Sequence, residues 1–202
     1  MTGVVPGAAR RTTSANCRGL PLCDSKNVDD TQSRRSLIAK GAFLLDIGDV
    51  THLLYFIHSG TIRYMIILPD SRQDVTKDFS FAPTFAASFG SSVQRQAARV
   101  GIMALTDYVL SIWPLPALTG QFDSHMEWQK LGRRLAEFLN LRKEDREIAF
   151  LTQTAEQRYA ALADEFPAQI GTVPQHHLAS YLGLTPESLS RLKARMAKRQ
   201  NL

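Results

Sequence analysis

The sequence predicts an α+β protein in which short strands are followed by one long helix and then by a helix-turn-helix. Three observations support this fold class: short apolar stretches separated by glycines, a long stretch without proline, and two short leucine-rich segments near the end. The first residues show no period of 2 or 3.6, so we expect them to be disordered. The predicted parts are a disordered segment (residues 1–34), a β-domain (35–122), a long helix (123–152) and a helical domain (153–202).

The composition limits the class of protein. With 202 residues, 44% of them hydrophobic, the chain is long enough for one medium domain and a small one. It has no run of about 18 apolar residues and begins without an apolar secretory segment, so we expect a cytoplasmic protein with no membrane partner. Cys17 and Cys23 form no CxxC, and the five histidines have no metal-ligand spacing. We therefore expect no structural disulfide, metal or cofactor.

The predicted β-domain consists of short strands separated by turn residues, which is typical of an all-β sandwich or barrel. Apolar residues alternate in segment 53–58, as in a strand that is buried on at least one face. Gly41, Gly48 and Gly60 fall in predicted turns, and Pro114 ends the sheet region because proline cannot donate a ladder hydrogen bond. The predicted strand segments include residues 37–38, 43–45, 53–58, 61–68, 79–85, 100–104 and 108–112.

Residues 123–152 form the longest predicted helix. Its apolar residues Trp128, Leu131, Leu135 and Phe138 are spaced by three, four and three residues, which places them on one face. Such a helix is about 45 Å long at 1.5 Å per residue, more than a small β-domain covers. We therefore expect the four residues to form the interface of a homodimer. The alternative is that the helix packs across its own sheet.

Two signals delimit the helical domain that follows. Thr154 and Gln157 have the spacing of a capping box, which predicts that a helix begins there. Pro167 ends this helix, and Pro174 precedes the first helix of the helix-turn-helix.

Residues 175–192 predict the helix-turn-helix itself. Small Ala179 lies where the helices would cross, and Gly183 suits the positive φ at the end of the first helix. Thr185 is the predicted N-cap of the second helix, which begins at Pro186 and carries five basic residues and one acidic residue to the end of the chain. This charge favours double-stranded DNA as the partner. The predicted DNA contacts are Thr185, Glu187, Ser188, Ser190, Arg191, Lys193, Arg195, Lys198 and Arg199.

At three places the sequence resembles the Crp/Fnr family of bacterial transcription regulators. Residues 53–63 look like the family's β-roll signature, residues 157–162 like the opening of its DNA-binding domain, and residues 173–192 like the helix-turn-helix of a compact branch without a wing. The resemblance covers roughly residues 36–197. It implies a homodimer in which a cyclic nucleotide-binding-like β-roll, a jelly-roll-like double-stranded β-helix, is coupled through the long helix to DNA binding.

The sequence departs from this family at the effector site. Members that bind cyclic nucleotides have Gly-Glu and, about ten residues later, Arg-Ser or Arg-Thr, whereas the matching positions here are Ala87 and Ala97-Ala98. A buried phosphate would therefore lack its bidentate guanidinium partner. Two cysteines are also too few for an iron–sulfur cluster. The β-roll then senses another small molecule or none, and the candidate contacts are Phe85, Ser88 and Arg99.

The resemblance also indicates which residues contact bases. In the family's recognition helix an Arg, a Glu and a second Arg commonly contact bases, and here Pro186 replaces the first while Glu187 and Arg191 match the others. The leading hypothesis is a sequence-specific transcription regulator. The alternative is a small-ligand sensor or protein-interaction module whose helix-turn-helix does not bind DNA. An enzyme is not expected, because neither a nucleophile motif nor a paired acid and base is present.

Overall fold

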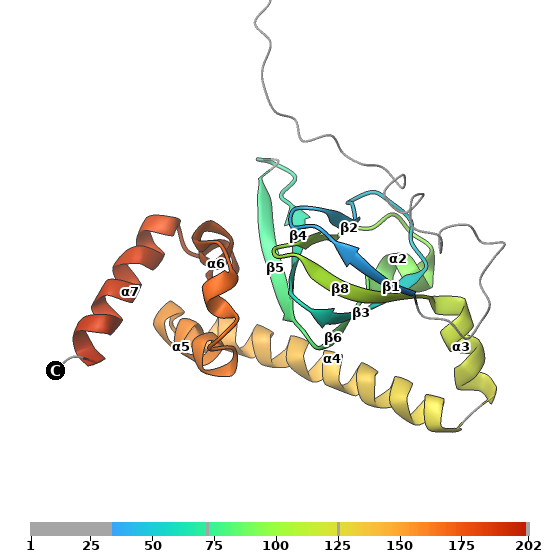
Figure 1. Cartoon of the computed structure of the whole chain (residues 1–202). Helices are drawn as coiled ribbons and strands as arrows, with labels where there is room; N and C mark the ends of the chain where they lie inside the picture. The colour runs from blue at the N-terminus through green and yellow to red at the C-terminus, as the bar shows by residue number, and fades with distance from the viewer. Residues whose placement is uncertain (1–33, 72, 125, 201–202) are drawn as a thin grey trace, which may run out of the picture.

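The computed structural model describes residues 34–71, 73–124 and 126–200. Within these ranges, eight strands form two four-stranded antiparallel sheets that pack face to face (Figure 1). The prediction for residues 1–33 lies outside the described residues, and Arg34 begins the first strand. In sheet order, the strands are β1 (Arg34–Ile38), β8 (Tyr108–Pro114), β3 (Leu53–Ser59) and β6 (Thr84–Ala86), then β2 (Phe43–Leu45), β7 (Gly101–Ala104), β4 (Thr61–Ile67) and β5 (Asp74–Phe81).

The two sheets enclose a hydrophobic core, as the alternation in the sequence predicts. On β3, Leu53, Tyr55 and Ile57 lie in this core, whereas Phe56 and His58 face the other way and form an aromatic contact. The turn from β3 to β4 requires glycine. Gly60 has a φ of +98°, and a Cβ there would lie 2.5 Å from the Cβ of Tyr108.

The β-domain also contains two short helices, which the sequence did not predict. Helix α2 (Phe89–Gln94) lies within a polar stretch of poor helix formers. Tertiary contacts explain it, because the hydroxyl of buried Ser91 accepts a hydrogen bond from the Thr51 N–H at 2.9 Å. Helix α3 (Leu115–Ser124) directly follows β8. Pro116, which stops a strand, is well suited to the first turn of a helix.

The helical part largely follows the prediction. The long helix α4 (Met126–Thr152) begins three residues later than expected, because residues 123 and 124 belong to α3. The capping box is confirmed, since the Gln157 N–H donates to the Thr154 hydroxyl and the Thr154 N–H to the Gln157 side chain. The remaining elements are α5 (Ala155–Glu165), the 3-10 turn η1 (Ile170–Thr172), α6 (Gln175–Leu182) and α7 (Pro186–Gln200), and α6 and α7 form the predicted helix-turn-helix.

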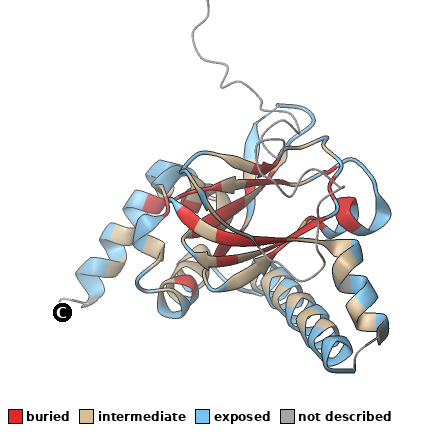
Figure 2. Cartoon of the chain, turned by 45° about the vertical axis from the view of Figure 1, so that its right-hand side comes forward, coloured by how far each residue is buried: buried red, intermediate tan, exposed pale blue. Residues whose placement is uncertain are grey.

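The helix-turn-helix packs against the β-domain of the same chain. Phe79 and Phe81 of β5 share one hydrophobic cluster with Leu178, Leu182 and other core residues of the helical domain. Helix α4, in contrast, runs below the β-domain with much of its surface outward (Figure 1), and Figure 2 shows that its residues are exposed or intermediate. None of the described helices is long and apolar enough to cross a membrane.

Candidate DNA-binding surface and its link to the β-domain

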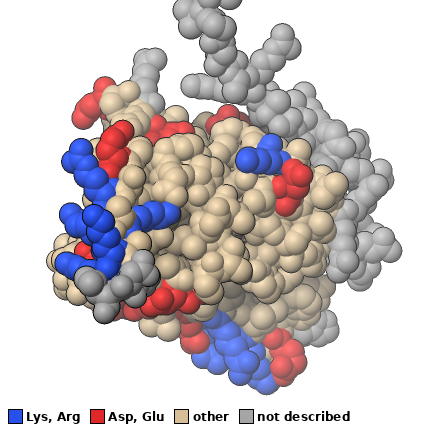
Figure 3. Space-filling model, turned by 60° about the vertical axis from the view of Figure 1, so that its left-hand side comes forward, with Lys and Arg blue, Asp and Glu red and all other residues tan. Residues whose placement is uncertain are grey.

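Helix α7 has one buried side and one charged, exposed side. Leu189 and Leu192 face the core of the helical domain, and Gly183, with a φ of +72°, forms the turn that separates α7 from α6. Lys and Arg side chains gather over this helix in the view of Figure 3, which brings its side of the molecule forward. The predicted contact residues Glu187, Ser190, Arg191, Arg195 and Lys198 are all exposed. A helix of this kind can enter a major groove.

The first turn of α7 is fixed by its N-cap. The Thr185 hydroxyl accepts a hydrogen bond from the Ser188 N–H at 3.2 Å, and it also donates to the Ser188 hydroxyl. Glu187 follows the cap. Its pKa is lowered by a hydrogen bond from its own backbone and by the Thr185 side chain, so the carboxylate is charged and can accept a hydrogen bond. Arg191 lies one turn further along the same exposed side.

Two of the basic residues among the predicted DNA contacts have partners on α5. The Lys193 ammonium lies 5.4 Å from the centre of the Tyr159 ring, and the Arg199 guanidinium lies 2.7 Å from the Glu156 carboxylate. Both contacts join α7 to α5. The exposed Arg195 and Lys198 are therefore better placed for phosphate contacts than Lys193 and Arg199 are.

The edge strand β5 holds the first helix of the helix-turn-helix. The Thr76 N–H, on the open edge of β5, donates to the Ser180 hydroxyl of α6 at 2.9 Å. Next to it, the ring centres of Phe79 and Tyr181 lie 5.1 Å apart, and those of Phe81 and Phe166 lie 4.4 Å apart. The β-domain therefore sets the orientation of α6, and through α6 that of α7.

A buried arginine lies under this contact, and sequence reasoning missed it. Arg63 of β4 is 1% exposed and donates to the Thr76 hydroxyl at 2.8 Å and to the Asp74 carboxylate at 2.9 Å. The hydrogen bond from Arg63 lowers the pKa of Asp74. Burial, the Arg63 charge and the adjacent His176 lower the pKa of His177 to about 4. The one signal in the sequence is an arginine inside an otherwise apolar strand.

A second group of contacts connects α4 to the helix-turn-helix. The Arg158 guanidinium donates to the Gln153 carbonyl after α4 at 2.5 Å and to the Leu182 carbonyl at the end of α6 at 2.9 Å. The same guanidinium lies over the Phe150 ring, 4.5 Å from the ring centre. Arg146 of α4 lies 3.9 Å from the centre of the Tyr181 ring. These contacts join the end of α4 directly to α6, next to the turn before α7.

The predicted dimer residues lie on an uncovered face of α4. Trp128, Leu131 and Phe138 are all exposed, Phe138 by 51%, and Leu135 is intermediate. None of the residues Met126–Thr152 is buried. Helix α3 covers another side of α4, where Phe122 lies against Gly132. The role of the four predicted residues in a dimer stays a prediction.

The three candidate effector contacts have different environments. Phe85 packs edge-on against Phe56 with 4.8 Å between the ring centres, and Trp113 lies 6.5 Å away. Ser88 is buried at the start of α2, whereas Arg99 is exposed before β7. They do not form one evident site, and a role in effector binding stays a prediction.

The fold and this surface define a class of protein. The solved structure of FixK2 from Bradyrhizobium japonicum has a TM-score of 0.72 at 16% identity, over 84% of this chain and 86% of FixK2. That of a transcriptional regulator of the Crp/Fnr family from Eubacterium rectale has a TM-score of 0.64 at 19% identity, over 89% and 87% of the two chains. The chain therefore has the fold of the Crp/Fnr regulators, which confirms the predicted fold and resemblance.

A relative is also found by sequence. The chain is 25% identical over 190 residues to the transcriptional regulatory protein btr of Bordetella pertussis, and the match covers 89% of this chain and 78% of btr. No protein-family model matches the chain.

Proposed function

We propose that this protein is a sequence-specific DNA-binding transcription regulator of the Crp/Fnr type. The observation that carries the proposal is α7, whose leucines are buried while Glu187, Arg191 and Arg195 are exposed along one side. Glu187 can accept from cytosine N4, and Arg191 can donate two hydrogen bonds to guanine. The similarity to btr, a transcriptional regulatory protein, supports the same function.

We infer that it acts as a homodimer formed along α4. The apolar stripe of Trp128, Leu131, Leu135 and Phe138 is accompanied on an adjoining side of α4 by Leu141 and Ile148, which are 59% and 50% exposed. Exposed apolar residues at this spacing are typical of an interface between helices. Two copies related by a two-fold axis would present two α7 helices to successive turns of the DNA major groove.

We also infer that the β-domain does not bind a cyclic nucleotide. Ala98, at a position where the family's phosphate-binding residues would lie, is buried in the hydrophobic core. Its backbone is engaged as well, because its N–H donates to the Asp49 carbonyl at 2.7 Å and its carbonyl accepts from the Gly48 N–H at 2.8 Å. An anionic phosphate here would meet apolar surroundings.

An electrophoretic mobility shift on the DNA upstream of its own gene tests the proposal. The protein should shift this DNA more strongly than random DNA, with or without cyclic AMP. Raising the salt from 50 to 200 mM should weaken binding steeply, by about tenfold or more, because bound phosphates release counterions. Lack of a shift on any DNA would contradict the proposal, and a shift that needs cyclic AMP would contradict the effector inference.

A further inference from the structure

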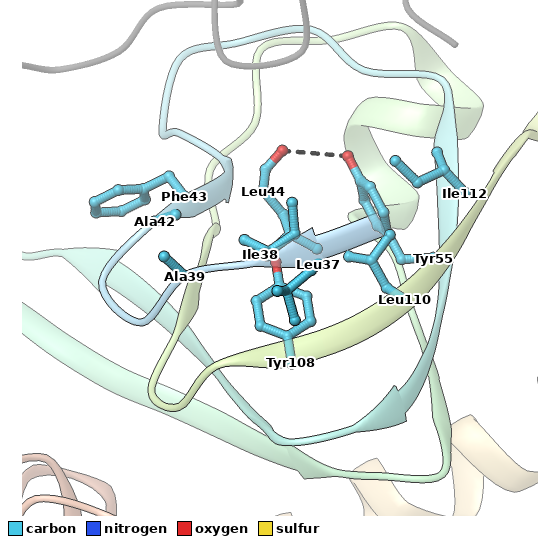
Figure 4. Close-up of a pocket in the computed structure, with 10 residues that line it drawn as sticks. All are labelled: Leu37, Ile38, Ala39, Ala42, Phe43, Leu44, Tyr55, Tyr108, Leu110 and Ile112. Carbon is cyan, nitrogen blue, oxygen red and sulfur yellow. Dashed lines mark hydrogen bonds between the residues drawn. The ribbon is translucent and has the colours of Figure 1, made fainter. Parts of the chain in front are cut away.

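A cavity of about 220 Å³, open to solvent on one side, lies in the β-domain next to the edge strand β1 (Figure 4). Its walls are side chains that otherwise belong to the hydrophobic core: Leu44, Tyr55, Tyr108, Leu110 and Ile112. Strand β1 and the turn after it form the rim, where Leu37 is 78% exposed and Ala39 is also exposed. The cavity therefore extends from the surface at β1 to buried side chains of the core.

The lining restricts the chemistry of a ligand. The described residues that line the cavity carry no charged side chain. The Tyr55 hydroxyl already donates to the Leu44 carbonyl at 3.2 Å, as the dashed line in Figure 4 shows. A charged ligand would lose its hydration here without gaining an ionic partner, whereas an apolar one would remove its own surface from water.

The size restricts the ligand further. Protein interiors are normally close-packed, and a dry apolar cavity of about 150 Å³ is enough to hold benzene. We propose that this cavity is a binding site for a small, neutral, apolar molecule, of the size of one substituted aromatic ring or a short hydrocarbon chain.

This site differs from the candidate effector site of the sequence. The cavity is not lined by Phe85, Ser88 or Arg99, and no residue of α4 lines it. Its connection to the rest of the protein runs through β8, which contributes Leu110 and Ile112 to the wall. Strand β8 continues directly into α3, and α3 packs on α4. A molecule in the cavity therefore contacts the strand that leads to the helix of the proposed dimer.

Titration calorimetry of the full chain with ethylbenzene tests the site, with benzoate as the charged comparison. We expect one equivalent of ethylbenzene to bind and benzoate to bind at least tenfold more weakly. Leu110→Phe fills the cavity from its wall and should weaken ethylbenzene binding at least tenfold. Ile66→Phe is the matched control, because half-buried Ile66 lies on β4 and does not line the cavity.

A second variant covers the case in which Leu110→Phe does not fold. Ala42→Leu adds volume from the turn after β1, where the side chain is only partly buried, and should also weaken binding at least tenfold. Failure of the folded wild-type protein to bind ethylbenzene, or equal binding by a folded cavity-filling variant, would overturn the proposal. The result is independent of DNA: one-to-one binding without any DNA shift would uphold the cavity site and refute the proposed function instead.

Discussion

The long helix α4 and the two helices of the helix-turn-helix have apolar residues at similar spacing, yet they bury them differently. None of the residues Met126–Thr152 is buried, whereas Leu178, Leu182 and Leu189 are 0% exposed. Helix α6 packs on α5, α7 and β5, while the first half of α4 meets mainly α3. The number of neighbouring elements, rather than apolar content, decides which leucines become core.

The two exposed helix surfaces differ in their chemistry, and we propose that they meet different partners. The uncovered side of α4 carries an apolar stripe, and covering such a stripe with a second protein surface releases water. The uncovered side of α7 carries Arg191, Arg195 and Lys198 and fits the phosphates and base edges of DNA. Four experiments test how these helices are packed and which partners their exposed surfaces meet.

The core of the helix-turn-helix should give the largest effect. Leu189→Ala removes a fully buried side chain and should lower the free energy of unfolding by about 2–5 kcal/mol, measured by denaturant titration. Leu151→Ala on α4 is the matched control. Leu151 is 86% exposed, so this change should stay within about 0.5 kcal/mol. Similar losses from both substitutions would refute the difference between the two regions.

Charges in the apolar stripe of α4 should separate the proposed dimer. We expect Leu131→Glu combined with Phe138→Glu to weaken self-association at least about 100-fold, or about 2.7 kcal/mol, in sedimentation equilibrium. The monomer should remain folded, because both residues are exposed in the single chain. Gln129→Glu adds a charge on another side of the same helix and should leave the dimer intact. An unchanged dimer in the double variant would place the interface elsewhere.

On the charged side of α7, Arg191→Ala tests base recognition. It should reduce discrimination between target and random DNA by about 1–3 kcal/mol in competition mobility shifts. Lys40→Ala removes the same charge from an exposed turn of the β-domain and should change neither affinity. Equal loss on both DNAs would mean that Arg191 contacts only phosphate.

The smallest effect concerns the contact between α6 and the β-domain. The pKa of His177 is about 4 in the folded protein against 6.5 ordinarily, so the unfolded chain binds more protons between these pH values. The contribution of His177 to the free energy of unfolding is then fully present above about pH 6.5 and is lost as the pH falls toward 4. Because His177 is only partly buried and solvent screens its charge, we expect the free energy of unfolding to fall by about 1 kcal/mol over this pH range.

Thermal unfolding at pH 7 and pH 5 measures this effect. His177→Gln should flatten the pH dependence in this window, whereas His52→Gln at an exposed position of the β-domain should preserve it. Arg63 and Asp74 also face His177, but the pKa of Asp74 lies below its ordinary value, so its titration falls below the window. An unaltered slope in His177→Gln would assign the pH dependence to another group.

The sequence by itself determined the elements whose signals are local. Glycine turns and alternating apolar residues located most of the strands, the Thr154 and Gln157 capping box located the start of α5, and Gly183 with Thr185 and Pro186 located the helix-turn-helix. These features depend on residues within a few positions of each other, so periodicity and capping chemistry suffice. The exposed charged side of α7 followed from the same spacing. The prediction of one strand segment at 79–85 was wrong, because the chain passes there from the end of β5 in one sheet to the start of β6 in the other.

Only the tertiary structure decided the features that depend on distant residues. Thr76 and Ser180, whose hydrogen bond holds α6 on β5, are 104 positions apart. The burial of Arg63 and the lowered pKa of His177 exist because that contact covers them. Helix α2 forms despite weak helix propensity because Ser91 has a partner on another segment. Local propensity cannot predict such features, because their stability comes from surfaces that only folding brings together.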